Sequence, residues 1–358
     1  MTSLIKTLTS FGITGWLAFL AIAILFYILI FYYKYFTREN PLPGPFPLPV
    51  VGSLYQNPGH FAKWIQDLHK KYGDMFEIWI GSQRQIWLNN AELIAKTTLT
   101  SLNTAFIIRY SHDSGLEEWG DTTGIGFNRV PWSWRYNRRL VNDAVNSLSF
   151  LKEFTGMMQR GFGELETYWK EIGLDKPQDI QLWVNRFISD MLYITTTGKN
   201  VKFMAKHFNS LSTDKKVELS TTMRLHSTAP IMFRTNNERT EVGGFSWKPD
   251  TQFGVNFQSV HHSSDLWKDA DKFIPERHLL SDKDLKRKFY PFGGGLHICP
   301  GRLFGTALLK TLVVVFFRKY NVELENPNTP IRTSHDFTLH SHDAIVRLSP
   351  RITTNKKM

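Results

Sequence analysis

An uncharged apolar run near the amino terminus restricts what that part of the chain can form. No charged side chain occurs between Lys6 and Lys34, and Ile13–Tyr33 is almost wholly apolar, with Trp16 near one end. A helix of about 20 such residues spans the hydrocarbon core of a bilayer. Tyr33 closes the run, and aromatic side chains at both ends are typical of membrane interfaces. The sequence therefore predicts a transmembrane helix over residues 13–33.

A buried core helix and a cleaved signal peptide are the alternatives for this run. A signal peptide has a shorter apolar region and small residues at its cleavage site, whereas this run ends in bulky aromatic residues and Lys34. An uninterrupted run of this length also favours a membrane span over a core helix. We therefore predict an uncleaved anchor over residues 1–40. Two basic residues, Lys34 and Arg38, follow the run, and one, Lys6, precedes it. This small difference indicates the orientation of the helix in the membrane only weakly.

A proline-rich segment, residues 41–52, follows the anchor. Four of its first seven residues are prolines, Pro41, Pro43, Pro45 and Pro47. Proline fixes its own φ and biases the preceding residue towards extended conformations. The segment is predicted to be a stiff, non-helical hinge. It leads into a globular domain over residues 53–358.

The globular part has a mainly helical pattern with small sheets, an α+β class. Apolar residues make up 42% of the chain and aromatic residues 14%, which is typical of a folded protein. The expected helices are His60–Tyr72, Ala91–Leu99, Trp134–Val145, Leu151–Trp169, Leu182–Ile194, Met223–His226 and Gly301–Tyr320. The expected strands are two within Met75–Leu88, Ile231–Arg234, Phe253–Phe257 and a pair in the closing FTLHSHDAIVRL.

The chain carries a net charge of +11, from 43 Lys and Arg against 32 Asp and Glu. Such an excess favours solubility and attraction to anionic surfaces, either a membrane headgroup layer or an acidic protein partner. The basic residues do not form runs interleaved with aromatic residues, and no Cys/His zinc spacing is present. Nucleic acid is therefore not the expected partner.

The single cysteine, Cys299, lies in the stretch most informative about chemistry. One cysteine excludes an intrachain disulfide and a Cys-rich zinc site, and most lone cysteines are small buried hydrophobes. Here three consecutive glycines precede Cys299, and Pro300 and Gly301 lead into an apolar helix. A helix amino terminus favours a thiolate, which is the form of cysteine that binds a metal.

This stretch resembles the haem-binding loop of the cytochrome P450 family, Phe-x-x-Gly-x-x-x-Cys-x-Gly. Phe292, Gly295, Cys299 and Gly301 occupy all four fixed positions. The resemblance implies that Cys299 is the thiolate ligand of the iron of haem b. It also implies the fold of that family after an anchor like that of its microsomal members.

The resemblance also points to residues that contact the haem propionates. WSWRYNRR is similar to the family's Trp-x-x-x-Arg helix, which gives Trp134 and Arg138 that role, and Arg234 and His297 match two further positions. A guanidinium pairs well with a carboxylate. Without Cys299, an amphipathic surface helix would be the preferred interpretation of Trp134 and Arg138.

A membrane monooxygenase is the function that the resemblance implies. Electrons would come from NADPH through a flavoprotein reductase, and one atom of dioxygen would enter an apolar small-molecule substrate. The reductase, the substrate and membrane lipid are the expected partners. The expected location is the endoplasmic reticulum membrane, with a single-pass anchor and the domain on the cytosolic face.

The chain departs from the family in its centre. Only residues 195–220 separate the predicted helix Leu182–Ile194 from TTMRLH, where the family has a much longer block. That block includes the helix whose acid–Thr pair delivers protons on the oxygen side of the haem. WGDTTG, at Trp119–Gly124, has the pattern of a loop, and ITTTG, at Ile194–Gly198, lacks the acid. Neither is a credible replacement, so the catalytic residues are not assigned.

A second departure concerns a buried ion network of the family. Thr221 occupies the position of its glutamate, which would leave Arg224 and Arg277 without their carboxylate, a costly arrangement if they are buried. Glu218 and Glu276 are possible substitutes. The alternative function is therefore a catalytically impaired or inactive membrane protein that at most binds haem or a lipid.

Overall fold

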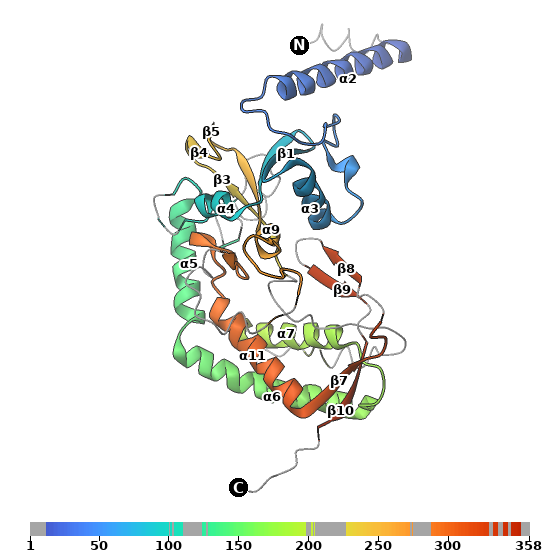
Figure 1. The fold of residues 1–358 in the computed structure, drawn as a ribbon, viewed down its shortest axis with the longest axis vertical. Coiled ribbons are helices and arrows are strands. Elements are labelled where there is room, and N and C mark those ends of the chain that lie inside the picture. Colours follow the sequence, from blue (N-terminus) through green and yellow to red (C-terminus); the bar gives the residue numbers. More distant parts are fainter. Residues whose placement is uncertain are drawn as a thin grey trace.

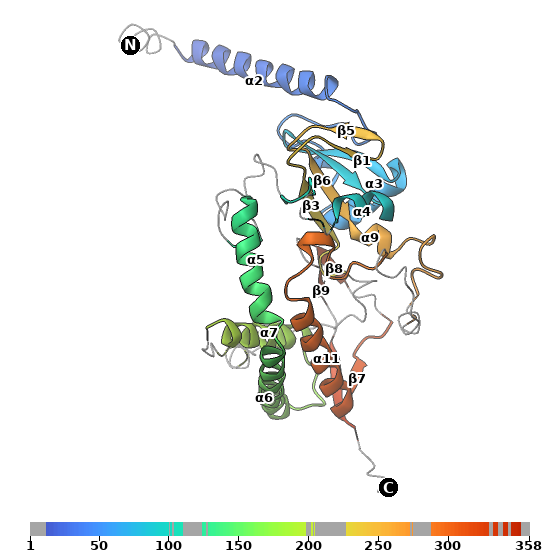
Figure 2. The ribbon, with the colours of Figure 1, turned by 90° about the vertical axis from the view of Figure 1, so that its left-hand side faces the viewer.

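The computed structural model describes residues 12–99, 101, 104–109, 124–126, 128–197, 202, 204, 227–272, 274, 288–328, 332–335, 339–342 and 345–351. Figure 1 shows three regions along the long axis of the molecule. Helix α2 extends at one end, a part that contains most of the strands lies beside it, and long helices occupy the other end. Figure 2 shows that α2 stands apart from the remaining helices.

Helices are the commonest element among the described residues. They are α2 (Ile13–Phe36), α3 (Phe61–Tyr72), α4 (Ala91–Thr97), α5 (Pro131–Val145), α6 (Leu148–Ile172), α7 (Ile180–Thr197), the short α9 (Phe257–His261) and α11 (Arg302–Lys319), with single 3-10 turns at Leu54–Gln56 and Gly295–His297. The strands in the described part of the chain are β1 (Met75–Ile80), β2 (Gln83–Leu88), β3 (Ile231–Thr235), β4 (Thr240–Val242), β5 (Phe245–Trp247), β6 (Gln252–Asn256), β7 (Tyr320–Leu324), β8 (Arg332–His335), β9 (Leu339–His342) and β10 (Val346–Pro350).

The main sheet has the strand order β1-β2-β6-β3. Strands β1 and β2 form an antiparallel hairpin, β2 pairs in parallel with β6, and β6 pairs antiparallel with β3. Close packing of the indole of Trp87 explains Gly254 in β6, since an added Cβ there would lie 2.6 Å from the ring. Every residue of β6 is buried, so this strand is the centre of the sheet-containing part.

A second core lies among α6, α7 and α11. The amphipathic face of α6 contributes Phe162, Leu165 and Trp169, and α7 contributes Phe187, all of them almost fully buried. Glu166 lies on the same side of α6 and accepts hydrogen bonds from Lys319 Nζ at 2.8 Å and Tyr320 Oη at 2.9 Å. A buried carboxylate with two donors joins α6 to the end of α11.

The predicted class, mainly helical with small sheets, is confirmed. The long helices occur where the apolar periodicity placed them, extended by a few residues at some ends. The closing strands are a correction. β9 and β10 both exist, but β9 pairs with β8 and β10 with β7, so they are not a pair with each other.

Some sequence-based predictions fall outside the described residues. They are the helix Met223–His226, the arginines Arg224 and Arg277 and their candidate acids, and most of Trp119–Gly124. Short strands β4 and β5 and the helix α9 were not predicted, because three to five residues carry too little periodicity to indicate an element.

Asp179 gives a prediction about stability and pH. Its Oδ1 accepts a hydrogen bond from the Leu182 N–H at 2.9 Å at the start of α7. Burial raises the pKa of Asp179 to about 6, against the lowering effect of the Leu182 and Gln181 N–H groups. The pKa of Asp179 in the folded chain lies above the unfolded value of about 3.9. The contribution of the protonated Asp179 to the free energy of unfolding is therefore fully present below about pH 4 and is lost as the pH rises through about 6.

The substitution Asp179→Asn keeps an oxygen for the cap and removes the titration. We expect urea unfolding of Asp179→Asn between pH 4 and pH 7 to show a flatter pH dependence than wild type, with equal or higher stability at pH 7. Asp175→Asn, at an exposed position in the same loop, is the control and should follow wild type. A wild-type pH slope in Asp179→Asn would contradict the assignment.

Candidate functional site

The loop Phe292–Gly301 is folded by its own backbone. The Cys299 N–H donates to the Phe292 carbonyl at 2.9 Å, and the Ile298 N–H donates to the Gly295 carbonyl at 3.1 Å. Helix α11 begins directly after Gly301, so Cys299 lies at its amino terminus and its thiol is exposed. An added Cβ on Gly301 would lie 3.9 Å from the Cys299 sulfur, so glycine keeps that side of the sulfur open.

The end of α4 supports the middle of this loop. The Leu296 N–H donates to the Leu99 carbonyl at 3.0 Å. Gly295 adopts a φ of +66°, and an added Cβ would lie 2.4 Å from the Thr98 carbonyl oxygen. Only glycine combines this left-handed conformation with such a close approach of two backbones. The fixed glycine of the motif is therefore explained by packing.

Helix α5 holds the other side of the loop. Trp134 and Arg138 are one turn apart on its buried face, with 3% and 8% of their surfaces exposed. An Arg138 Nη2–H donates to the Ile298 carbonyl, and the Asn146 side-chain amide donates to the Pro300 carbonyl at 3.2 Å. The residues that flank Cys299 are thus fixed from a separate helix.

His297 lies at the centre of the arrangement. Its Nε2 is 3.1 Å from the Ile107 carbonyl, and its Nδ1 accepts a hydrogen bond from Arg109 Nε at 3.2 Å. The centroid of the Trp134 ring system lies 4.6 Å from the imidazole centroid. Burial, reinforced by the charges of Arg234, Arg109 and Arg138, lowers the pKa of His297 to about 2. The imidazole is therefore neutral, with its proton on Nε2.

Three guanidinium groups concentrate positive charge beside the loop. Arg109, Arg138 and Arg234 all act on His297. Burial and the charge of Arg109 lower the pKa of Arg138, whereas Cys299 raises it. The Arg138 Nη1 atom is buried and has no hydrogen-bond partner among the residues that the structure describes. Buried N–H groups of this kind are suited to a carboxylate.

The structure brings together the residues predicted from the sequence. Trp134, Arg138, Arg234 and His297 all lie around the loop that carries Cys299. Their donors are used unequally. The Trp134 indole N–H donates to the Ile125 carbonyl at 3.2 Å, and both nitrogens of His297 have partners within the chain. Arg138 is the member of the set with a buried N–H left for an added group.

Arg109 was missed in the sequence. It lies in FIIR, where Ile108 forms an isolated bridge with Thr235 beside Arg234. A lone arginine after three apolar residues in an extended stretch is the only local signal. Its partner His297 is 188 positions away, so periodicity does not reveal the contact.

A haem fits this set of side chains by two observations. The exposed thiol at the start of α11 offers one soft, anionic ligand to a metal. The buried Nη1 of Arg138, with Arg109 and Arg234 nearby, suits the carboxylates at the edge of the ring.

Comparison with known proteins gives one family. The family model "Cytochrome P450" matches residues 42–222 and 219–348. The two matched segments meet at residues 219–222, the position at which the sequence predicts the missing central block. This pattern agrees with a chain that is shortened in its interior.

Curated relatives match smaller parts. A geissoschizine oxidase of Strychnos nux-vomica is 34% identical over 137 residues, which is 37% of this chain and 27% of that protein. A bifunctional dihydrocamalexate synthase/camalexin synthase of Arabidopsis thaliana is 34% identical over 36% of this chain and 26% of its own length. Cytochrome P450 71B12 of the same plant is 28% identical over 41% of this chain and 32% of its length. The matches span about a quarter to a third of these relatives.

Two glycines of the loop allow backbone strain to be separated from steric conflict. Gly293 and Gly295 both have positive φ, +73° and +66°, but only Gly295 faces a backbone carbonyl within 4 Å. A non-glycine residue in the left-handed region costs about 1–3 kcal/mol. We expect Gly293→Ala to lower the free energy of unfolding by about that much. Gly295→Ala should lower it clearly more, because Thr98 must also move.

Denaturant unfolding of the two variants measures this difference. Gly305→Ala, whose added Cβ would lie 3.6 Å from Phe292 in ordinary contact, is the control for a glycine in a helix. Equal losses in Gly293→Ala and Gly295→Ala would show that the loop does not press on the end of α4.

Proposed function

Because the chain belongs to the cytochrome P450 family, we propose that it is a haem-thiolate protein of monooxygenase type with Cys299 as the ligand of the iron. The observation that carries the proposal is the exposed thiol at the start of α11 beside Arg138, whose buried Nη1 has no partner in the described part of the chain.

Each residue of the site has a separate task in this proposal. Cys299 binds the metal, and the amino terminus of α11 stabilises its thiolate. Phe292, Gly295 and Gly301 shape the loop so that the sulfur faces outward. Arg138 and Arg234 bind the carboxylates of the haem. His297 orients Arg109 for the same purpose, because its Nδ1 accepts a hydrogen bond from Arg109 Nε. Trp134 packs against His297 and holds it in place.

The bound haem would supply dioxygen activation, with electrons that reach it from NADPH through a flavoprotein reductase. The substrate would be an apolar small molecule. Around the haem, the chain provides the ligand, neutralises the carboxylates and keeps their charge away from bulk water.

Helix α2 supports a membrane location. It has 24 residues with a mean hydropathy of 2.5 in its most apolar window, and none of that window is buried. We propose residues 1–40 as the anchor, 41–52 as the Pro-rich hinge and 53–358 as an incomplete haem domain. The domain would lie on the cytosolic face of the endoplasmic reticulum.

An impaired relative that binds haem without efficient turnover is the second candidate. The observation in its favour is the junction of the two family segments at residues 219–222. The block that the sequence predicts to be absent there contains the acid–Thr pair of the family.

The first test concerns Cys299. We expect the ferrous carbon-monoxide difference spectrum of wild type to show a thiolate-ligated haem, and Cys299→Ala to abolish that signal. Cys299→His should shift the Soret band, because a neutral imidazole donates less electron density than a thiolate. Arg318→Gln, at an exposed position of α11, is the control. A thiolate spectrum in Cys299→Ala would contradict the assignment, since no other cysteine exists.

The second test concerns turnover. With a flavoprotein reductase, the impaired form is expected to pass most of the electrons of NADPH to hydrogen peroxide and few to oxygenated product, whereas an efficient monooxygenase would pass most of them to product. Without the family's block over the oxygen side, water would enter and weaken the electrostatic control of a closed site. NADPH use, peroxide and product are measured together, with Cys299→Ala as the blank. Tight coupling of NADPH use to product would rule out the impaired form.

A further inference from the structure

A buried carboxylate lies between the anchor and the domain. Glu77 is on β1 and only 2% exposed. Its Oε2 accepts hydrogen bonds from Arg84 Nε at 2.9 Å and from the Leu42 N–H at 3.2 Å, and its Oε1 accepts one from the Trp79 indole at 3.3 Å. Arg38 Nε lies 2.6 Å from Oε1, as a close ion pair at an angle that does not make an aligned hydrogen bond.

These contacts connect two parts of the chain. Arg38 and Leu42 belong to the segment that follows α2, whereas Glu77 and Arg84 belong to the β1–β2 hairpin. The other nitrogens of Arg84 donate to the carbonyls of Glu39 and Asn40, each at 2.6 Å. The segment is thus held to the hairpin through both side chains and backbone.

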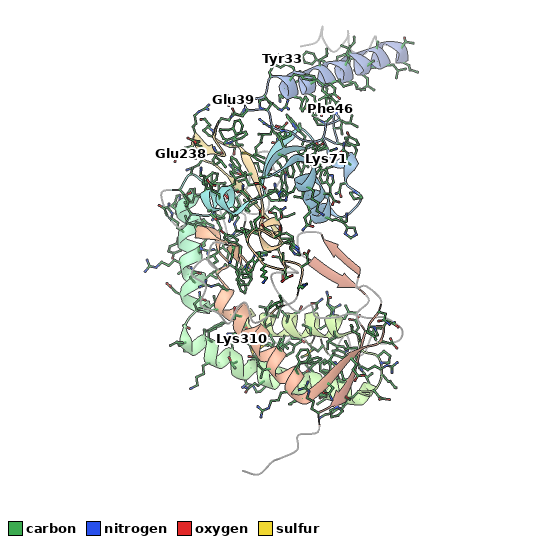
Figure 3. All side chains as sticks on the ribbon, viewed as in Figure 1. Tyr33, Glu39, Phe46, Lys71, Glu238 and Lys310 are labelled. Carbon is green, nitrogen blue, oxygen red and sulfur yellow. The ribbon has the colours of Figure 1, made fainter. Side chains whose placement is uncertain are left out.

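The last turns of α2 pack on the same place. Phe31 is 3% exposed, and its ring lies 5.7 Å from Trp79. Tyr32 stacks on Phe46 at 5.7 Å, and the Tyr27 hydroxyl accepts a hydrogen bond from the Val50 N–H at 3.2 Å. Figure 3 shows Glu39 and Phe46 close to the end of α2 that carries Tyr33.

A buried charge is tolerated when partners and hydrogen bonds surround it. Glu77 has two guanidiniums and two neutral N–H donors, so its ionised form is well satisfied. Its removal would leave Arg38 and Arg84 side by side with like charges, which favours release of the segment after α2.

We propose that Glu77 locks the direction in which the anchor leaves the domain, and thereby sets which face of the domain rests on a phospholipid bilayer. The inference rests on the proposed anchoring by α2. Val50, whose N–H donates to the Tyr27 hydroxyl of α2, and its neighbours Leu48 and Val51 have exposed apolar side chains. Held in this way, these side chains would face the lipid beside the anchor.

Trypsin cleavage after Arg38 tests the lock directly, on the full chain in phosphatidylcholine vesicles. The Arg38 side chain is 13% exposed and paired, so wild type should resist cleavage between Arg38 and Glu39. Glu77→Gln should be cut many times faster there. Asp67→Asn, which removes an exposed ion pair with Lys63, should behave as wild type. Equal cleavage of wild type and Glu77→Gln would overturn the proposal.

A second measurement does not disturb the sheet. A photo-crosslinking residue at position 51 should label lipid in wild type and in Lys34→Gln. Arg38→Gln removes the same charge from the locked segment and should lose most of the labelling. Equal labelling in Arg38→Gln and Lys34→Gln would overturn the proposal.

A wash with alkaline carbonate tests the membrane anchor separately from the orientation of the domain on lipid. Wild type that stays with the vesicles confirms the anchor. Wild type that washes off, with protected Arg38, would overturn the anchor and with it the orientation on lipid, although the contact of Glu77 with Arg38 would stand.

Discussion

The imidazole of His297 connects the strand-containing part of the molecule to the helices α5 and α11. It sits in the loop before α11, and it bonds to Ile107 and Arg109 in the stretch that pairs with β3 of the main sheet. Trp134 of α5 packs on the same ring. The position of Cys299 therefore depends on the sheet, on α5 and on α11 together, because each supports the loop at a different residue. A neutral imidazole suits this role, since it can donate from one nitrogen and accept at the other.

The charges around this imidazole explain why it remains neutral. A cation at His297 would add to Arg109, Arg138 and Arg234 in a buried space, and burial alone already disfavours it. Three guanidiniums in one place are costly unless an anion balances them. In the proposed site a thiolate at Cys299, which acts on the pKa of Arg138, would supply one negative charge, and the carboxylates of a bound haem would supply the rest. In that arrangement the thiolate and the three arginines would stabilise each other electrostatically.

Patterns within a short stretch of sequence predicted the elements that such a stretch forms. The glycines, Cys299 and the helix that follows form one continuous stretch, and α6 and α7 repeat their apolar residues at helical spacing. Contacts between distant segments were not readable in this way. β10 has the same alternation whether it pairs with β9 or with β7, so partner choice depends on the packing of α11 and its turn into β7. Arg109 and Glu77 were missed for a related reason. A single charge in an apolar stretch reveals that a partner is needed, without indicating which distant residue supplies it.

One side of helix α11 has apolar residues that are exposed in the described part of the chain. Its stretch Leu312–Phe317 is wholly apolar, which is typical of a helix segment that is buried on more than one side. In the described part of the chain, Val313, Val314 and Phe317 are nonetheless 44%, 59% and 48% exposed. An apolar cavity of about 150 Å³ opens between α6, α7 and α11, beside Trp169 and Phe316. An apolar helix face that the described neighbours leave exposed is a surface for further packing, and the family match in two segments agrees with a chain shortened in its interior. Among the described residues, the packing around α11 is therefore open on the side of Val313 and Phe317, which also line this cavity.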